Sequence, residues 1–124
     1  MDEKICLDTY LCIEIIKKNK NLLDFVDIND FPYLTSVTVF ELLLRETKTD
    51  EIGYLLNSFY ILDFNEDSAK IASNIHKYLK KAGTLLDLKD VFIAATCIAN
   101  NCRLATLNKK HFNRIKELKL LSLN

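Results

Sequence analysis

The pattern of hydrophobic and polar positions alternates between two periods along the chain. Short apolar runs of strand length give way to longer segments in which apolar residues recur three and four positions apart. The short runs predict five strands, at residues 4–7, 33–35, 60–64, 103–106 and 118–123. Such an alternation of strands and helices is typical of an α/β fold with a parallel sheet.

The longer segments predict amphipathic helices between these strands. In residues 67–81 an apolar stripe ends shortly before Gly83, a residue type that commonly terminates helices. Other helices are predicted around Leu11 to Ile16 and at residues 22–28, 38–46, 51–58, 88–100 and 109–115. Right-handed crossovers between parallel strands place helices on both faces of the sheet. We therefore expect a three-layer α/β/α sandwich with a central, mainly parallel sheet, in a single domain spanning residues 1–124.

The composition agrees with one compact domain. Two glycines and one proline among 124 residues exclude collagen-like and low-complexity chains, and this length supports one hydrophobic core. The acidic start and the absence of a long apolar run argue against a signal peptide or a membrane helix, so we expect a cytoplasmic protein without a membrane partner. The cysteines have no CxxC spacing, which favours buried free thiols over a zinc site or disulfides. They are Cys6, Cys12, Cys97 and Cys102.

Four polar residues stand where a predicted strand gives way to a helix, the edge at which open α/β sheets bind ligands. They are Asp8, Glu41, Asp90 and Asn108. Each also has a structural interpretation, because short polar residues at helix starts cap free backbone amides. Thr38 and Glu41 have the spacing of a capping box, Asp87 and Asp90 have a related one, and Asn108 suits the start of the helix at 109–115.

Three carboxylates, from Asp8, Glu41 and Asp90, meet in one crevice if their strands are adjacent and parallel. Like charges at close range repel, so the arrangement favours a hard divalent cation such as Mg²⁺ or Mn²⁺, an ion suited to phosphate chemistry. Residues 101–124 carry six basic residues against one glutamate, although the whole chain has no net charge. An acidic pocket beside basic surface is the combination that a nuclease needs.

Four blocks of sequence, in this order and spacing, resemble the motifs of PIN-domain ribonucleases, and most closely the VapC-type toxins of type II toxin-antitoxin systems. The blocks are LDT at 7–9, TSVTVFEL at 35–42, DVFIAAT at 90–96 and ATLNKKHF at 105–112. The resemblance covers the whole chain and implies a metal-dependent endoribonuclease that hydrolyses RNA phosphodiester bonds with Mg²⁺ or Mn²⁺.

The resemblance also implies roles for the candidate residues. Asp8 and Asp90 are the principal metal ligands in this interpretation, and Glu41 completes the acidic set, orienting a metal-bound water. Asn108 occupies a fourth polar position that relatives often fill with Asp. Two departures from the family pattern leave room for reduced or altered activity. Tyr10 replaces a small polar residue, and the amide of Asn108 removes one negative charge, which makes a second metal ion less favourable.

Family resemblance further implies a homodimer and a cognate antitoxin whose tail lies in an apolar groove. Leu22, Leu23, Phe25 and Val26 are candidates for lining that groove or for the core. One alternative function is a degenerate PIN module that binds RNA or a protein without cutting it. Another is a receiver-like phosphoacceptor domain, with Asp63 following a strand.

Overall fold

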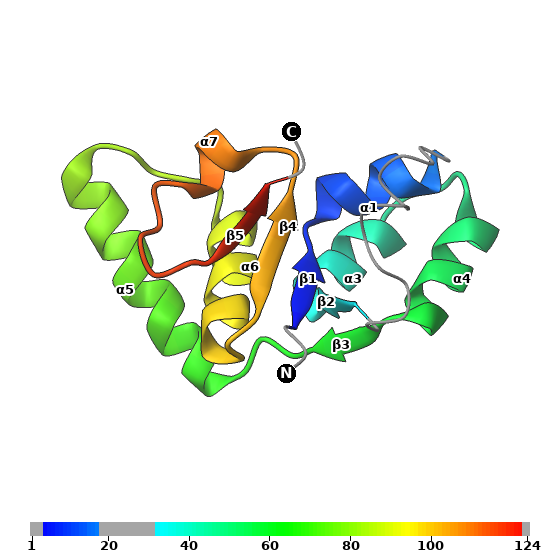
Figure 1. The fold of residues 1–124 in the computed structure, drawn as a ribbon, viewed down its shortest axis with the longest axis horizontal. Helices are drawn as coiled ribbons and strands as arrows, with labels where there is room; N and C mark the ends of the chain where they lie inside the picture. Colours follow the sequence, from blue (N-terminus) through cyan, green and yellow to red (C-terminus); the bar gives the residue numbers. More distant parts are fainter. Residues whose placement is uncertain (1–3, 18–31, 123–124) are drawn as a thin grey trace.

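The computed structural model describes residues 4–17 and 32–122, and its centre is a sheet of five short strands (Figure 1). All pairings are parallel, and the strand order is β3-β2-β1-β4-β5. The strands are β1 (Ile5–Leu7), β2 (Tyr33–Thr35), β3 (Tyr60–Leu62), β4 (Arg103–Thr106) and β5 (Leu120–Ser122). The five predicted strands are thus confirmed, most of them with shorter limits.

Helices cover both faces of the sheet, which confirms the three-layer α/β/α sandwich. In Figure 1, α1, α3 and α4 lie on one side of the strands, and α5 and α6 lie on the other. The helices are α1 (Thr9–Ile16), α3 (Ser36–Leu43), α4 (Thr49–Ser58), α5 (Glu66–Ala82), α6 (Leu88–Ala99) and α7 (Lys109–Phe112). The helix predicted at residues 22–28 lies outside the described residues.

The sheet separates two hydrophobic clusters, because successive strand residues point to opposite faces. In β1, Cys6 packs into the cluster under α5 and α6, and the next residue, Leu7, packs into the cluster under α1, α3 and α4. In β4, Leu104 and Ala105 divide between the clusters in the same way. Both faces of the central strands are therefore buried, as the apolar runs in the sequence indicate.

All four cysteines are buried, and none forms a disulfide. Cys97 and Cys102 lie at the C-terminal end of α6, where the amide of Cys102 donates to the carbonyl of Cys97 at 2.9 Å. Asn101 between them has a φ of 52°, so this turn closes the helix and leads directly into β4. Within the described part of the chain, no helix is both long and apolar enough to span a bilayer.

The helix starts differ in two places from the sequence interpretation. The second unit begins at Ser36 instead of Thr38, because Thr35 is the cap and its side-chain oxygen accepts from the Thr38 amide at 3.1 Å. The predicted capping box of Thr38 and Glu41 is therefore wrong. Asp90 was expected at the end of a strand, but α6 follows α5 with no strand between them, so the third carboxylate lies in the first turn of a helix that no strand precedes.

Candidate active site

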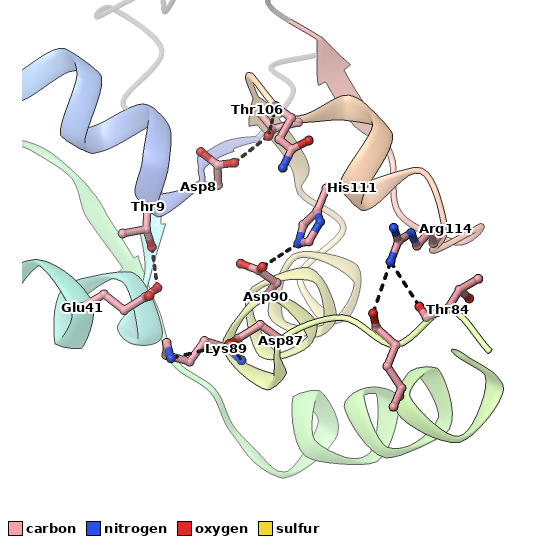
Figure 2. Close-up of polar contacts among 12 residues, drawn as sticks. Asp8, Thr9, Glu41, Thr84, Asp87, Lys89, Asp90, Thr106, His111 and Arg114 are labelled. Atoms are coloured by element: carbon pink, nitrogen blue, oxygen red, sulfur yellow. Dashed lines mark hydrogen bonds and ion pairs between the residues drawn. The ribbon is translucent and has the colours of Figure 1, made fainter. Parts of the chain in front are cut away.

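A pocket of about 560 Å³ lies at the carboxyl ends of β1 and β4, facing the start of α6 (Figure 2). This is the edge at which open α/β sheets bind ligands. The lining brings together all four candidate residues from the sequence. It consists of Asp8, Thr9, Tyr10, Ile13, Glu41, Asp90, Leu107, Asn108, His111 and Phe112.

Asp8 directly follows β1, and only 4% of its surface is exposed. One carboxylate oxygen, Oδ1, accepts from the backbone amide of Leu11 at 2.8 Å and so caps α1. The other, Oδ2, accepts from the Thr106 hydroxyl on the neighbouring strand β4 at 2.6 Å. The capping interpretation of Asp8 is therefore correct, yet the same side chain also lines the pocket.

The environment of Asp8 disfavours its charged form. Burial raises the pKa of this carboxyl above its ordinary value, while the hydrogen bonds from Thr106 and Leu11 partly oppose that rise. The negative charges of Asp90 and Glu41 raise the Asp8 pKa further. The three carboxylates are thus close enough to interact electrostatically. A cation in the pocket would offset both the desolvation cost of the charged Asp8 and the repulsion among the carboxylates.

Glu41 lies in the middle of α3, and its position is set by Thr9. The Thr9 hydroxyl donates to Glu41 Oε1 at 2.7 Å and lies 3.0 Å from the Thr38 hydroxyl. Thr35 in turn donates to the Thr38 hydroxyl at 3.4 Å. A chain of threonine hydroxyls therefore runs from the end of β2 to the glutamate. Figure 2 shows the Glu41 carboxylate held by Thr9 on the side of the site that faces Asp8 and Asp90.

Asp90 is the third residue of α6, and Asp87 is the residue that caps this helix, through the amide of Lys89 at 2.8 Å. Asp90 is not the capping residue, and its Oδ2 lies 2.8 Å from Nε2 of His111 on α7. Both side chains are 30% exposed. The helix N-terminus also favours a negative charge at this position.

Asn108 lines the pocket, but it does not cap α7 as predicted, since its side chain makes no capping hydrogen bond. Instead, its backbone amide donates to the Thr106 hydroxyl at 2.9 Å. That hydroxyl therefore links the Asn108 backbone to the Asp8 carboxylate. The side-chain amide of Asn108, in contrast to its backbone amide, is available to a ligand in the pocket.

Sequence reasoning did not single out His111 or Thr9, although both stand in the quoted blocks. Thr9 could have been found from its position beside Asp8, where a hydroxyl at a helix start reaches neighbouring polar groups. His111 pairs with a residue 21 positions earlier, and no local pattern encodes such a contact. Its imidazole is the one basic side chain among the lining residues, which include no lysine or arginine.

The donor types suit a hard cation, although the spacing is open. Among the described residues, no three His, Cys, Asp or Glu side chains stand close enough together to hold a metal ion as they lie. Mg²⁺, however, is commonly bound by one or two carboxylates together with waters and substrate phosphate. Asp8 and the partly exposed carboxylates of Glu41 and Asp90 fit that requirement.

Comparisons with known proteins agree with this geometry. The family described as PIN domain matches residues 5–118. Ribonuclease VapC3 of Methanocaldococcus jannaschii is 41% identical over 90 residues, covering 72% of this chain and 93% of that protein. Ribonuclease VapC1 of the same organism is 32% identical over 119 residues, covering 96% of this chain and 86% of that protein.

Solved structures show the same fold. VapBC-1 from nontypeable Haemophilus influenzae superposes with a TM-score of 0.83 and 26% identity, over 95% of this chain and 96% of that one. VapBC2 from Rickettsia felis, solved bound to a DNA fragment from its promoter, has a TM-score of 0.85 at 21% identity, over 95% and 97% of the two chains. Together with the carboxylate pocket, these matches show that this chain belongs to the PIN-domain family and is a homologue of the VapC ribonucleases.

Proposed function

We propose that this chain is a metal-dependent endoribonuclease that hydrolyses RNA phosphodiester bonds and acts as the toxin of a type II toxin-antitoxin pair. The observation that carries the proposal is the convergence of Asp8, Glu41 and Asp90 on one pocket, where the charges of Glu41 and Asp90 raise the pKa of the buried Asp8 carboxyl. The relatives named ribonuclease VapC support the choice of RNA as substrate.

The chain's own residues would share the work as follows. Asp8 and Asp90 hold Mg²⁺ or Mn²⁺, which supplies neutralisation of phosphate charge and a more acidic water when bound. Asp8 contributes a fixed ligand, because both of its oxygens are held by hydrogen bonds. Glu41, oriented by Thr9, accepts a proton or hydrogen bond from the attacking water. Asn108 donates its amide to the substrate phosphate.

The proposal includes partners and an overall organisation. We take residues 1–124 as a single nuclease domain that works in the cytoplasm, forms a homodimer and is silenced by an antitoxin protein. Solved relatives are VapBC toxin-antitoxin complexes, which supports the antitoxin. Phe40, Leu43 and Leu44 near the end of α3 are more than half exposed, an apolar surface that a protein partner could cover. The groove candidates among residues 22–26 lie outside the described residues.

The test is metal-dependent cleavage by purified, chelator-treated protein. Mg²⁺ and Mn²⁺ are titrated in, labelled total RNA is added, and the products are mapped for the unmodified protein and for Asp8→Asn. The matched control is Asp63→Asn, which removes an exposed carboxylate after β3 that does not line the pocket. We expect discrete fragments from the unmodified protein and from Asp63→Asn, and none from Asp8→Asn.

A second candidate function, RNA or protein binding without cleavage, is favoured by the amide at Asn108 and the half-exposed ring of Tyr10 in the pocket. Metal binding without any cleavage of total RNA would select it. Membership of the PIN-domain family leaves no support for the receiver-like alternative at Asp63, which stands beside the edge strand β3.

A further inference from the structure

A second cavity, of about 300 Å³, is lined by residues of α5, by Ile98 of α6 and by the segment that follows α7. It shares no lining residue with the carboxylate pocket, so the proposed hydrolysis makes no use of it. Its floor is formed by Ile71, Ile75, Ile98 and Ile115, and its polar rim by Asn74, Tyr78, Arg114, Lys116 and Glu117. We refer to it as the Tyr78 pocket.

The rim combines an aromatic ring with two cations. Tyr78 is 50% exposed, and the Lys116 ammonium lies 5.8 Å from the centre of its ring. Arg114 donates through Nη1 to the carbonyls of Thr84 and Leu85, at 3.4 and 3.2 Å. Within the described residues Arg114 makes no other hydrogen bond, so Nη2 and Nε can donate to a ligand. Two anchored cations beside a ring favour a ligand with a flat face and negative charge.

The basic character of the rim continues along α5. Residues 71, 74, 75 and 78 line the pocket and share one face of the helix, and Lys81 extends that face by about one turn. Lys81 is exposed, as are its neighbours Lys77 and Lys80. Glu117 is the one acidic residue on the rim. The surface around the pocket therefore complements an anionic chain longer than a single ligand.

The two pockets adjoin along the sequence. His111 and Phe112 at the end of α7 line the carboxylate pocket, and Arg114 and Ile115 line the Tyr78 pocket, so Asn113 alone separates the two linings along this segment. Two exposed lysines, Lys109 and Lys110, lie on α7 itself. A single strand whose phosphate reaches the carboxylates can follow this basic connection to the second pocket.

We propose that the Tyr78 pocket holds an unpaired base of the RNA strand, with its flanking phosphates on Arg114, Lys116 and Lys81. This inference rests on the proposed ribonuclease function and names a second contact for its substrate. The cavity volume is at the lower end of small-ligand sites, suited to one nucleotide. Aromatic stacking accepts any base, so the pocket contributes affinity and places the strand without selecting its sequence.

The experiment measures binding of labelled, mixed-sequence single-stranded RNA by fluorescence anisotropy in chelator, so its outcome does not depend on catalysis. We expect Tyr78→Ala to raise the Kd about tenfold, as loss of one stacked base does. Tyr78→Phe keeps the ring and should stay within about twofold of the unmodified protein. The matched control is Tyr54→Ala, since Tyr54 is 78% exposed on α4 and lines neither pocket.

Two further arms identify the ligand. Lys116→Ala should lower the slope of log Kd against log salt concentration by about one, the effect of one lost phosphate contact. Uridine monophosphate should compete only weakly, and competition as strong as that of the RNA strand would assign the pocket to a free nucleotide instead. An unchanged Kd in Tyr78→Ala would overturn the inference even if the unmodified protein cleaves RNA with metal. Absence of cleavage, with the expected Kd changes, would instead overturn the nuclease proposal alone.

Discussion

Two sides of the carboxylate pocket are built in different ways. The sheet arm, formed by Asp8, Leu11 and Thr106, holds its carboxylate by both oxygens and leaves it 4% exposed. The helix arm, formed by Asp90 and His111, holds its carboxylate by one contact and leaves both side chains 30% exposed. The family resemblance gives the two aspartates the same role, yet their surroundings are opposite.

The difference follows from position in the fold. Asp8 ends the central strand, where both faces are covered, so its oxygens must find hydrogen bonds inside the protein. Asp90 lies in the first turn of α6 at the edge of the pocket, where water can hydrogen-bond to its carboxylate. The sheet arm therefore fixes the location of the site at the cost of burying a charge. The Asp90 carboxylate of the helix arm is less constrained, so it can shift when a metal ion or substrate binds.

The largest expected effect comes from lengthening each aspartate by one methylene. In Asp8→Glu the longer side chain has no space in its buried position and loses both hydrogen bonds. The rate of RNA cleavage should therefore fall by about 100-fold or more, the scale of a misplacement near 1 Å. Asp90→Glu, on the solvated side, should stay within about tenfold of the unmodified protein. Initial rates of RNA cleavage at saturating Mg²⁺ compare the two variants. Equal losses would break the distinction between the arms.

Removing the Thr106 hydroxyl tests the rigidity of the sheet arm. Thr106→Val keeps the shape but leaves the buried Asp8 oxygen and the Asn108 amide without their partner, so the free energy of unfolding should fall by about 2 kcal/mol. Thr106→Ser is the control, because it keeps the hydroxyl. Urea denaturation gives both values. Equal free energies of unfolding in Thr106→Val and Thr106→Ser would show that the hydroxyl does not contribute to stability.

Removing the His111 ring tests the helix arm. Partners that orient metal ligands contribute about 10-fold to 100-fold in metal affinity, and the exposed position places His111 at the lower end. His111→Ala should therefore weaken apparent Mg²⁺ affinity about tenfold, and His111→Gln should recover part of the loss. Calorimetric titration with Mg²⁺ measures this. Tighter binding in His111→Ala would mean that the histidine competes with the ion.

The smallest effect is on stability without metal. Because the pKa of Asp8 is raised in the folded protein, folding favours its protonated form, and stability falls as pH rises through that pKa. Asp8→Asn should thus be more stable than the unmodified protein at neutral pH in chelator. That advantage should fade as the pH approaches the ordinary aspartate range. Unfolding curves across pH measure it, and a constant difference would contradict the burial argument.

Local patterns accounted for much of the fold. The strand limits of residues 33–35 and 103–106 were predicted correctly, because buried apolar runs have little choice of structure. The stop at Gly83 was also correct, and its φ of 72° explains why glycine stands there. The start of α3 was missed, because Thr35 and Thr38 are both good capping residues. Thr35 is the cap because β2 ends there and α3 follows at once.

Local patterns accounted for less of the candidate site. They marked Asp8, Glu41, Asp90 and Asn108, but they misplaced Asp90 at a strand end and gave Asn108 a capping role that it does not have. The pairing of Asp90 with His111 depends on how α6 and α7 pack, which no local spacing encodes. The Tyr78 pocket likewise joins distant segments, α5 and residues 114–117, and no local pattern marked it.

The hydrogen bond between Asp8 and Thr106 joins residues that are 98 positions apart. A chain on the ribosome that has been made only as far as α5 can pair β1, β2 and β3, but Asp90, Thr106 and His111 do not yet exist. Long-range parallel pairing is also the slow part of folding. The strand order therefore means that the carboxylate pocket cannot form before β4 and α7 have been made.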